Sequence, residues 1–425
     1  MQTLSKYVIL GGALLLGYGA TATAATFVDL GNAAGKQCVA VSVNDSGQTV
    51  GSCSTATPSA NDNPWYAASS AGPQQVLPPL VANQPCSVGS IGNSGVMVGR
   101  CTDASNFNFA VTWSAAAPAA APIKLTPLPA TLLFPLLRPA DVHTYATAQN
   151  QQGAVLGLSI SGSGKSTVVL YRPGMTAPER ISDWDSMCLG MVVNNTLISG
   201  YPSILMNCPV NGKIVARVVR RSGGGYTTTD LPVPAGASYC IAVDMNDQNQ
   251  AVGSCLYPHS ATNSSKTAFW PTPTSAPLLL TLPLNAMNSG VAVNNDGHVL
   301  ARGTAPSGFT TDFYWADTSS SFGVQPIPFL PGSVSTKAFG LAENETVAMD
   351  CTDSAEYATA CTWDPINGTQ AIAPIGGGHQ SMLNSISFSG TFIAGASRRQ
   401  CRGGALALRG WSPPVVLDPG LRRWV

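Results

Sequence analysis

One stretch of the sequence looks like a phosphate-binding loop, the segment SGSGKST that contains Lys165. In an ATPase loop, a glycine five residues before the second glycine lets successive backbone N–H groups wrap a phosphate, but this position is Ser159. The lysine of such a loop also begins a helix, whereas STVVLYRPG is a β-branched and aromatic run that stops at Pro173. We therefore predict a hairpin turn followed by a strand, and no nucleotide cofactor.

The eleven cysteines carry a second informative spacing. Three pairs each enclose fourteen residues and lie symmetrically about an Asn/Asp/Gly turn: Cys38–Cys53, Cys86–Cys101 and Cys240–Cys255. Folding each segment on its turn places the two cysteines opposite each other, about 4.5–5.5 Å apart at Cα, which a disulfide tolerates. In three related segments both positions are lost together, as Thr144/Ser159, Asn288/Gly303 and Ser381/Ala396. This paired loss favours three disulfides over independent buried thiols.

Two further bridges are predicted, from a hairpin to the loop or strand that follows it. These are Cys351–Cys361 and Cys188–Cys208. Cys401 is then left over in the segment RRQCRGG, where nearby arginines favour its thiolate. It is interpreted as a free thiol, as an intermolecular link, or as a sign that one of these two pairings is wrong.

Residues for acid–base or metal chemistry are few. The chain has four glutamates, and its four histidines (143, 259, 298 and 379) fall in four different repeats, with no C-x-x-C motif that would indicate zinc. The compact cluster Asp183–Trp184–Asp185 is interpreted as a turn between blades, because aspartate favours turns. No G-x-S-x-G motif marks a nucleophile. We predict no catalytic, cofactor or metal site.

The composition and the first residues indicate where the protein is located. Residues 1–24 contain Lys6, an apolar run of about a dozen residues and the cleavage pattern Ala22-Thr23-Ala24, which together are typical of a secretory signal peptide. We expect an exported protein, secreted or periplasmic, without a membrane span, and export favours disulfides. Only 10% of residues are charged, with 21 basic against 21 acidic, which argues against nucleic acid as a partner.

An internal repeat accounts for most of the chain. Five segments pair two short β-prone runs around a tight turn, and three weaker copies follow the same pattern; these segments are 38–53, 86–101, 144–159, 240–255, 288–303 and, more weakly, 188–200, 339–351 and 382–395. Their turns are spaced by about 49 residues on average, which is the repeat length of propeller blades. Glycine and proline are abundant, and helix-forming lysine and glutamate are scarce.

Two more runs follow each hairpin. The third run often ends in an aromatic residue, at Trp113, Tyr171, Trp270, Trp315 and Trp363, and the fourth is flanked by proline. Four strands per repeat predict an all-β fold, a β-propeller with about eight repeats (seven blades possible) that forms one domain over residues 25–425. The segment 27–31 (FVDLG) is expected to complete a blade with the C-terminal strands. We expect the tryptophans to pack blade against blade.

The hairpin pattern resembles the HAF-type extracellular repeat of bacterial secreted proteins. The best copy runs from Ala40 through Asn44, Asp45 and Gly47 to Gly51. This resemblance implies export and a propeller-like fold, and it implies no defined biochemical activity.

Two functions follow from this pattern. The first is a non-catalytic binding or scaffolding module for a protein or glycan partner outside the cell or at its surface, because the framework repeats while its loops vary. The second is a secreted glycan-active enzyme, a hydrolase or lyase with its site at the axial mouth. The scarcity of carboxylates and histidines favours the first, and the sequence leaves the oligomeric state open.

Overall fold

The computed structural model describes residues 30, 36–55, 63–69, 72–133, 136–258, 265–280, 282, 287–316, 318, 323–374 and 380–398 of the 425-residue chain. The predicted signal peptide (residues 1–24), most of 27–31 and Cys401 lie outside them. The described residues form strands and turns and contain no helix, so no helix there could span a membrane.

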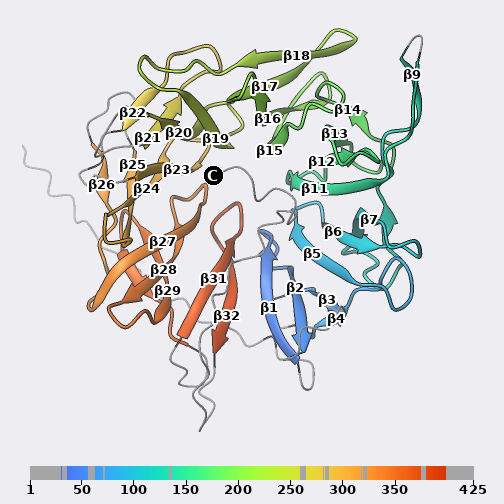
Figure 1. Cartoon of the computed structure of the whole chain (residues 1–425). Helices are drawn as coiled ribbons and strands as arrows, with labels where there is room; N and C mark the ends of the chain where they lie inside the picture. Colours follow the sequence, from blue (N-terminus) through green and yellow to red (C-terminus); the bar gives the residue numbers. More distant parts are fainter. Residues whose placement is uncertain are drawn as a thin grey trace, which may run out of the picture.

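Seven four-stranded antiparallel sheets follow one another along the chain as the blades of a propeller (Figure 1). Blade 1 is β1 (Lys36–Val43), β2 (Thr49–Thr55), β3 (Asn63–Ala67) and β4 (Gln75–Val76); blade 2 is β5 (Cys86–Ile91), β6 (Val96–Thr102), β7 (Asn108–Ser114) and β8 (Ile123–Lys124). Blade 3 is β11 (His143–Gln149), β12 (Val155–Ile160), β13 (Ser166–Tyr171) and β14 (Glu179–Arg180); blade 4 is β15 (Leu189–Ile198), β16 (Tyr201–Val210), β17 (Lys213–Ser222) and β18 (Gly225–Asp230). Blade 5 is β19 (Tyr239–Met245), β20 (Ala251–Leu256), β21 (Ser265–Trp270) and β22 (Leu278–Leu280); blade 6 is β23 (Met287–Val293), β24 (Val299–Thr304), β25 (Thr310–Trp315) and β26 (Gln325–Pro326). Blade 7 is β27 (Ser333–Leu341), β28 (Val347–Asp353), β29 (Ala358–Asp364) and β30 (Gly368–Ala371).

Two hairpins stand outside these seven sheets. The pair β9 (Thr131–Leu133) and β10 (Leu136–Arg138) projects between blades 2 and 3. The pair β31 (Gln380–Ile386) and β32 (Ile393–Arg398) is the eighth repeat and lies between blade 7 and blade 1 (Figure 1). The predicted all-β propeller is confirmed, with seven complete blades and an eighth hairpin in the ring.

In five of the eight first hairpins a glycine lies opposite the bend, at positions 51, 99, 157, 253 and 395, whereas the other three have Met206, Ala301 and Met349 there. All eight hairpins shift register near the middle of their first strand, as between Ala40 and Ser42 in blade 1. A Cβ on Gly51 or on Gly253 would lie far inside van der Waals contact of a backbone carbonyl oxygen on the partner strand. The glycine that follows valine in the repeat therefore leaves room for a bulge.

The core of the propeller lies between adjacent blades. The residues that end the third strands are at most 5% exposed, as predicted for packing residues: Trp113, Tyr171, Trp270, Trp315 and Trp363. The indole Nε1 of Trp113 donates to the carbonyl of Pro78, and that of Trp270 donates to the carbonyl of Pro232, both at 2.9 Å. Each proline follows the fourth strand of the preceding blade, so these tryptophans join neighbouring blades.

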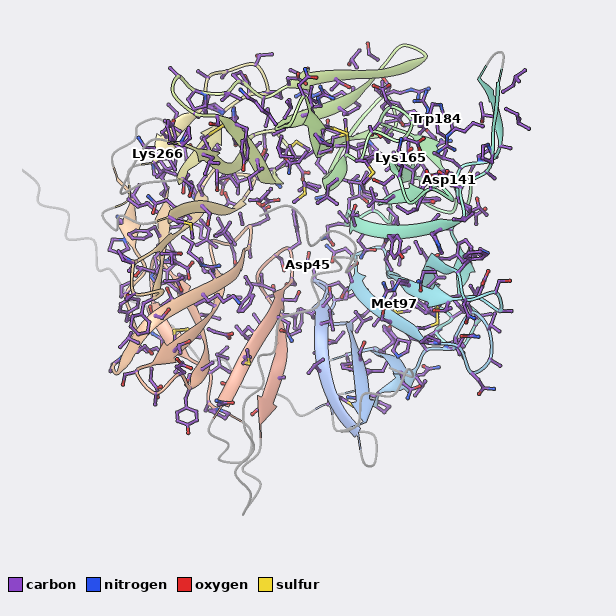
Figure 2. All side chains as sticks on the ribbon, in the orientation of Figure 1. Asp45, Met97, Asp141, Lys165, Trp184 and Lys266 are labelled. Carbon is purple, nitrogen blue, oxygen red and sulfur yellow. A yellow bond between two sulfur atoms is a disulfide. The ribbon has the colours of Figure 1, made fainter. Side chains whose placement is uncertain are left out.

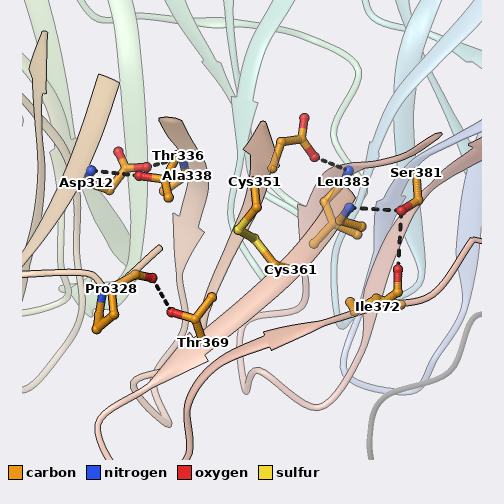
Figure 3. Close-up of a disulfide and its surroundings, with 12 residues drawn as sticks. Asp312, Pro328, Thr336, Ala338, Cys351, Cys361, Thr369, Ile372, Ser381 and Leu383 are labelled. Carbon is orange, nitrogen blue, oxygen red and sulfur yellow. Dashed lines mark hydrogen bonds between the residues drawn. A yellow bond between two sulfur atoms is a disulfide. The ribbon is translucent and has the colours of Figure 1, made fainter. Parts of the chain in front are cut away.

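The described residues contain five disulfides, and they are the five predicted pairs. In the three symmetric pairs the cysteines are direct cross-strand partners at Cα separations of 4.0–4.1 Å, closer than the expected range. Cys188–Cys208 joins the start of β15 to β16, so it is a bridge within a longer hairpin and not a link to a later segment. Cys351–Cys361 joins β28 to β29, with a Cα separation of 6.1 Å (Figure 3).

Where a repeat lacks the first cysteine, a hydroxyl can join neighbouring blades. Thr144 Oγ1 accepts from the backbone N–H of Ala110, and Ser381 Oγ accepts from that of Ala360, both at 2.9 Å. Figure 3 shows the Ser381 contact beside the Cys351–Cys361 bridge. The position of the first cysteine therefore carries either a disulfide within a blade or a hydroxyl that is hydrogen-bonded to the neighbouring blade.

A closed series of hydrogen bonds joins the first-hairpin turns around the axis. In the first seven repeats the second turn residue donates its backbone N–H to an oxygen of the next turn, over distances of 2.6–3.0 Å. The donors are Asp45, Asn93, Gln151, Asn195, Asp247, Asn295 and Glu343. Glu343 donates to the carbonyl of Phe388 in the eighth turn, and the next residue, Ser389, closes the series by donating its N–H to Asp45 Oδ1. Asp45 lies beside the centre of the ring (Figure 2). The ring thus has eight members, although the fourth turn is formed by a bulge.

Candidate functional site

A cavity of about 510 Å³ lies between the outer strand of blade 3 and the last hairpin of blade 4. One wall is β14 and the loop that follows it, and the other is formed by β17 and β18 (Figure 1). We call this cavity the 3–4 groove. Its lining is Glu179, Arg180, Ile181, Ser182, Asp183, Ser186, Cys188, Met206, Arg217, Arg221, Gly224, Gly225, Tyr226 and Thr228.

The wall on blade 4 exists because its strands are long. β15, β16 and β17 have ten residues each, and two-residue turns join them. Ser199–Gly200 and Asn211–Gly212 have positive φ at both residues, which matches the twist of a tight hairpin. Asn195 still joins the axial ring, through a bulge in β15. The hairpins of blade 4 therefore extend beyond a framework that they share with the other blades.

Strand alternation decides which arginines of β17 reach the groove. Val219 packs in the core toward blade 3, whereas Ala216 and Val218 pack toward blade 5. Arg217 and Arg221 share the face of Val219 and line the groove, so Arg220 lies on the opposite face. The three arginines lie within five residues of the sequence, but the strand divides them between its two faces.

Glu179 is held at the centre of the groove wall. Its carboxylate pairs with Arg172, accepts a hydrogen bond from the Tyr226 hydroxyl at 2.8 Å on Oε2, and lies 3.9 Å from Arg221 Nη1. Burial, followed by the contact with Glu179, raises the pKa of Tyr226 above its usual value, so Tyr226 remains a donor. Both oxygens of Glu179 are therefore engaged, and the residue positions its neighbours.

Arg221 is oriented by aromatic rings. Its guanidinium carbon lies 4.5 Å from the centroid of Tyr201 and 5.0 Å from that of Tyr226, and these two rings meet edge to face. Its nearest described carboxylate is the one at 3.9 Å, beyond hydrogen-bond distance. The guanidinium is therefore held between two rings in a residue that lines the groove.

Trp184 forms the far end of this polar region. Arg138 and Arg180 lie 4.0 and 5.1 Å from its ring centroid, and Arg138 pairs with Asp141 at 2.8 Å and with Asp185 at 2.9 Å. Figure 2 shows Trp184 and Asp141 close together on blade 3. The cluster Asp183–Trp184–Asp185 lies between β14 and β15, as predicted for a turn between blades, and Asp183 lines the groove.

A second polar cluster, which the sequence did not reveal, joins the turns of blades 6 and 7. Asp296, His298 and Glu345 place one possible ligand atom each within 4.8 Å of one another. His298 Nδ1 lies 3.0 Å from Glu345 Oε1 and 2.7 Å from the Tyr314 hydroxyl. The sequence predicts no metal site, and this cluster draws on two successive turns, which spacing within one turn cannot show.

Several carboxylates near the axis have shifted pKa values. Burial raises the pKa of Asp244 to about 6, although its two oxygens accept backbone N–H groups from Val293 and Met245 at 2.9 Å. Burial, and then the charges of Asp247, Asp296 and Asp244, raises the pKa of Glu343. Burial alone would raise the pKa of Asp45, but hydrogen bonds from Ser389 and Asn93 lower it. These carboxylates accept bonds from the ring backbone.

The glycine-rich segment forms a hairpin turn, as predicted. Ser161 accepts the backbone N–H of Gly164 on its carbonyl and that of Lys165 on its hydroxyl, and Gly164 has φ +81°. β13 follows as a strand from Ser166. Lys165 therefore lies on the turn between β12 and β13 (Figure 2) and not at a helix N-terminus.

Comparison with known proteins identifies a fold. No family model and no curated protein matches this sequence. Among solved structures, a post-proline cleaving enzyme from Rickettsia typhi superposes with a TM-score of 0.54 at 8% identity, over 84% of this chain and 55% of that chain. Prolyl oligopeptidase B from Galerina marginata gives a TM-score of 0.51 at 8% identity, over 80% and 50%. A puromycin hydrolase gives 0.51 at 10% identity, over 85% and 58%.

The chain thus spans about half the length of these structural neighbours. At identities of 8–10%, the likeness is one of fold. It places the chain among the β-propellers.

Proposed function

We propose that this protein is an exported, non-catalytic β-propeller that binds a protein or glycan partner through the 3–4 groove. The observation that carries the proposal is the arrangement of Arg217, Arg221 and Tyr226 on one face of an extended hairpin above a cavity of about 510 Å³. Cavities of roughly 300–1,000 Å³ are typical of small-ligand sites.

Export is supported by the five disulfides and by the signal-like residues 1–24. The likeness of the best hairpins to the HAF-type extracellular repeat points to the same location. In this proposal, the repeated framework keeps the blades rigid and the lengthened blade 4 supplies the binding surface.

The alternative is a secreted glycan-active enzyme with its site at the axial turns. The raised pKa of Glu343, close to Asp247 and Asp296, favours this function, because a glycosidase needs one protonated and one ionised carboxyl group. Against it, Asp247 and Glu343 accept backbone hydrogen bonds within the axial ring, and in this position they join turns.

The test compares binding and turnover on one preparation made in an oxidising compartment. The wild type and Arg217→Glu are applied to arrays of glycans and of cell-surface proteins, and in parallel to a panel of glycosidase and esterase substrates. We expect binding that Arg217→Glu weakens at least tenfold, because it replaces the partner of Asp230 by a second carboxylate in the groove wall. Turnover that is abolished by Glu343→Gln would establish the enzyme and end the binding-module proposal.

A further inference from the structure

We infer that the ligand of the 3–4 groove is an acidic saccharide whose carboxylate or sulfate is bound by Arg221. This inference rests on the proposed function and specifies its ligand. It follows from the charges, the free donors and the chemistry of the groove walls.

The groove carries an excess of positive charge in a chain that is neutral overall. Two of the nearby arginines are neutralised, because Arg172 pairs with Glu179 and Arg217 Nε pairs with Asp230 Oδ1 at 2.7 Å. Arg180 and Arg221 then remain opposite Asp183, which is exposed, and Glu179 lies 3.9 Å from Arg221 Nη1 as well. The lining residues, three arginines against two acids, carry one net positive charge. An anionic group is therefore the complementary partner.

Arg221 has the geometry of an anion-binding arginine. Tyr201 and Tyr226 hold its guanidinium plane, and Glu179 keeps Tyr226 in position through a hydrogen bond of 2.8 Å. An arginine that is fixed in advance loses little side-chain entropy when its fork of donors binds two oxygens of a carboxylate or sulfate. Arg180 donates one hydrogen bond, from Nη1 to the carbonyl of Ser182 at 3.0 Å.

The remaining walls suit a sugar. Thr228 and the glycines 224 and 225 offer a hydroxyl and backbone groups, and the Tyr226 ring offers an apolar face with a polar tip. The apolar lining residues, Ile181, Cys188 and Met206, are buried at the base. A protein partner usually anchors an apolar or aromatic side chain in a pocket with an apolar lining, so this groove favours a polyhydroxylated ligand.

The experiment uses Arg221→Gln with Arg220→Gln as the matched control. Both remove one charge from the same strand, but Arg220 lies on the face turned toward blade 5. The probes are oligosaccharides in matched sets: uronic-acid trisaccharides, their carboxyl-reduced neutral forms, their sulfated forms, and a glutamate-rich peptide. Binding is measured by calorimetry in about 50 and 300 mM salt, a range that screens exposed charge pairs.

We expect an acidic trisaccharide to bind at least tenfold more tightly than its neutral form, and its affinity to fall at least tenfold in Arg221→Gln and less than twofold in Arg220→Gln. The carboxylated and sulfated probes identify which anion is preferred. Equal binding of neutral and acidic forms, equal loss in both variants, or binding of the peptide alone would overturn the inference while the proposed binding function stands. No binding in any arm, together with turnover in the parallel screen, would overturn both.

Discussion

Blades 4 and 5 are neighbours built on the same repeat, yet they differ in what their outer parts do. Blade 5 has strands of seven, six, six and three residues and a disulfide, Cys240–Cys255, that spans 15 positions. Blade 4 has three strands of ten residues, and its equivalent disulfide, Cys188–Cys208, spans 20. Both blades still contribute to the axial ring, through Asn195 and Asp247.

The difference teaches that this fold separates two tasks within a blade. The inner hairpin carries the ring bonds, the bulge and the cysteine pair, and these features are repeated around the axis. The added length of blade 4 lies beyond those features and forms one wall of the 3–4 groove. A binding surface can therefore be enlarged without changing the framework.

The largest effect should come from the cysteine pairs. Replacing both cysteines of a pair by serine should lower the free energy of unfolding by about 3 kcal/mol for Cys240–Cys255, from the entropy of closing a loop of this size. The longer loop of Cys188–Cys208 should cost slightly more by the same reasoning. Guanidinium unfolding of each double variant under oxidising conditions checks this, with the disulfide-intact wild type as the reference. If the blade 4 pair proved to be without effect, the two blades would not share one framework.

Replacing one glycine in each blade should show that the framework of blade 5 tolerates an added side chain less well than the extended hairpin of blade 4. Gly253→Ala should cost about 2 kcal/mol, because its Cβ would collide with the backbone carbonyl of Ile241 and the bulge would have to shift. Gly200→Ala should cost about 1 kcal/mol, because Gly200 has φ +81° but open space around it. Thermal unfolding of both variants ranks these costs. The opposite order would show that turn conformation, and not crowding at the bulge, limits the repeat.

A pH experiment should show whether buried carboxylates belong to the framework. Burial raises the pKa of Asp350 in blade 7 to about 7, and its Oδ1 accepts the backbone N–H of Leu383 at 2.9 Å. Because the folded pKa lies above the unfolded value, the folded state binds more protons between about pH 4 and pH 7. The stability that the protonated Asp350 carboxyl contributes is fully present below about pH 4 and is lost as pH rises toward 7.

Asp350→Asn keeps the accepting oxygen and removes the titration. We expect it to be more stable than the wild type by about 1–2 kcal/mol at pH 8 and nearly equal to it at pH 4.5. Urea unfolding at the two pH values measures the difference, and Asp364→Asn, at an exposed turn, serves as the control. A stabilisation that is the same at both pH values would exclude protonation as the cause.

The fold was predictable because its determinants are local and repeated. The turns around Asp45 and Asp247, the cysteine pairs and the third-strand tryptophans each recur at a fixed spacing, so their places followed from the sequence. The 3–4 groove was not predictable, because it depends on strand alternation in β17 and on hairpin length in blade 4. Arg220 and Arg221 are adjacent in sequence, and only the core contacts of Val218 and Val219 show which of them lines the groove.

The cluster around His298 was missed for a related reason. Its partner Glu345 lies in the next repeat, and the contact depends on how two neighbouring turns approach each other. Spacing within a repeat carries no information about that approach. This contact between two particular turns therefore emerges only from the folded structure.

The closed axial ring has a consequence for how the chain is assembled. Every turn finds its hydrogen-bond acceptor in the next repeat, 44 to 58 residues later, except at the closure, where Ser389 donates to Asp45 across 344 residues. During synthesis each turn can form its bond to the next repeat as soon as that repeat has been made. The Asp45 carboxylate, however, finds its donor Ser389 only when nearly the whole polypeptide has been synthesised. The first blade made is therefore the last to be completed, and a chain cut short before residue 389 would leave the circle open beside blade 1.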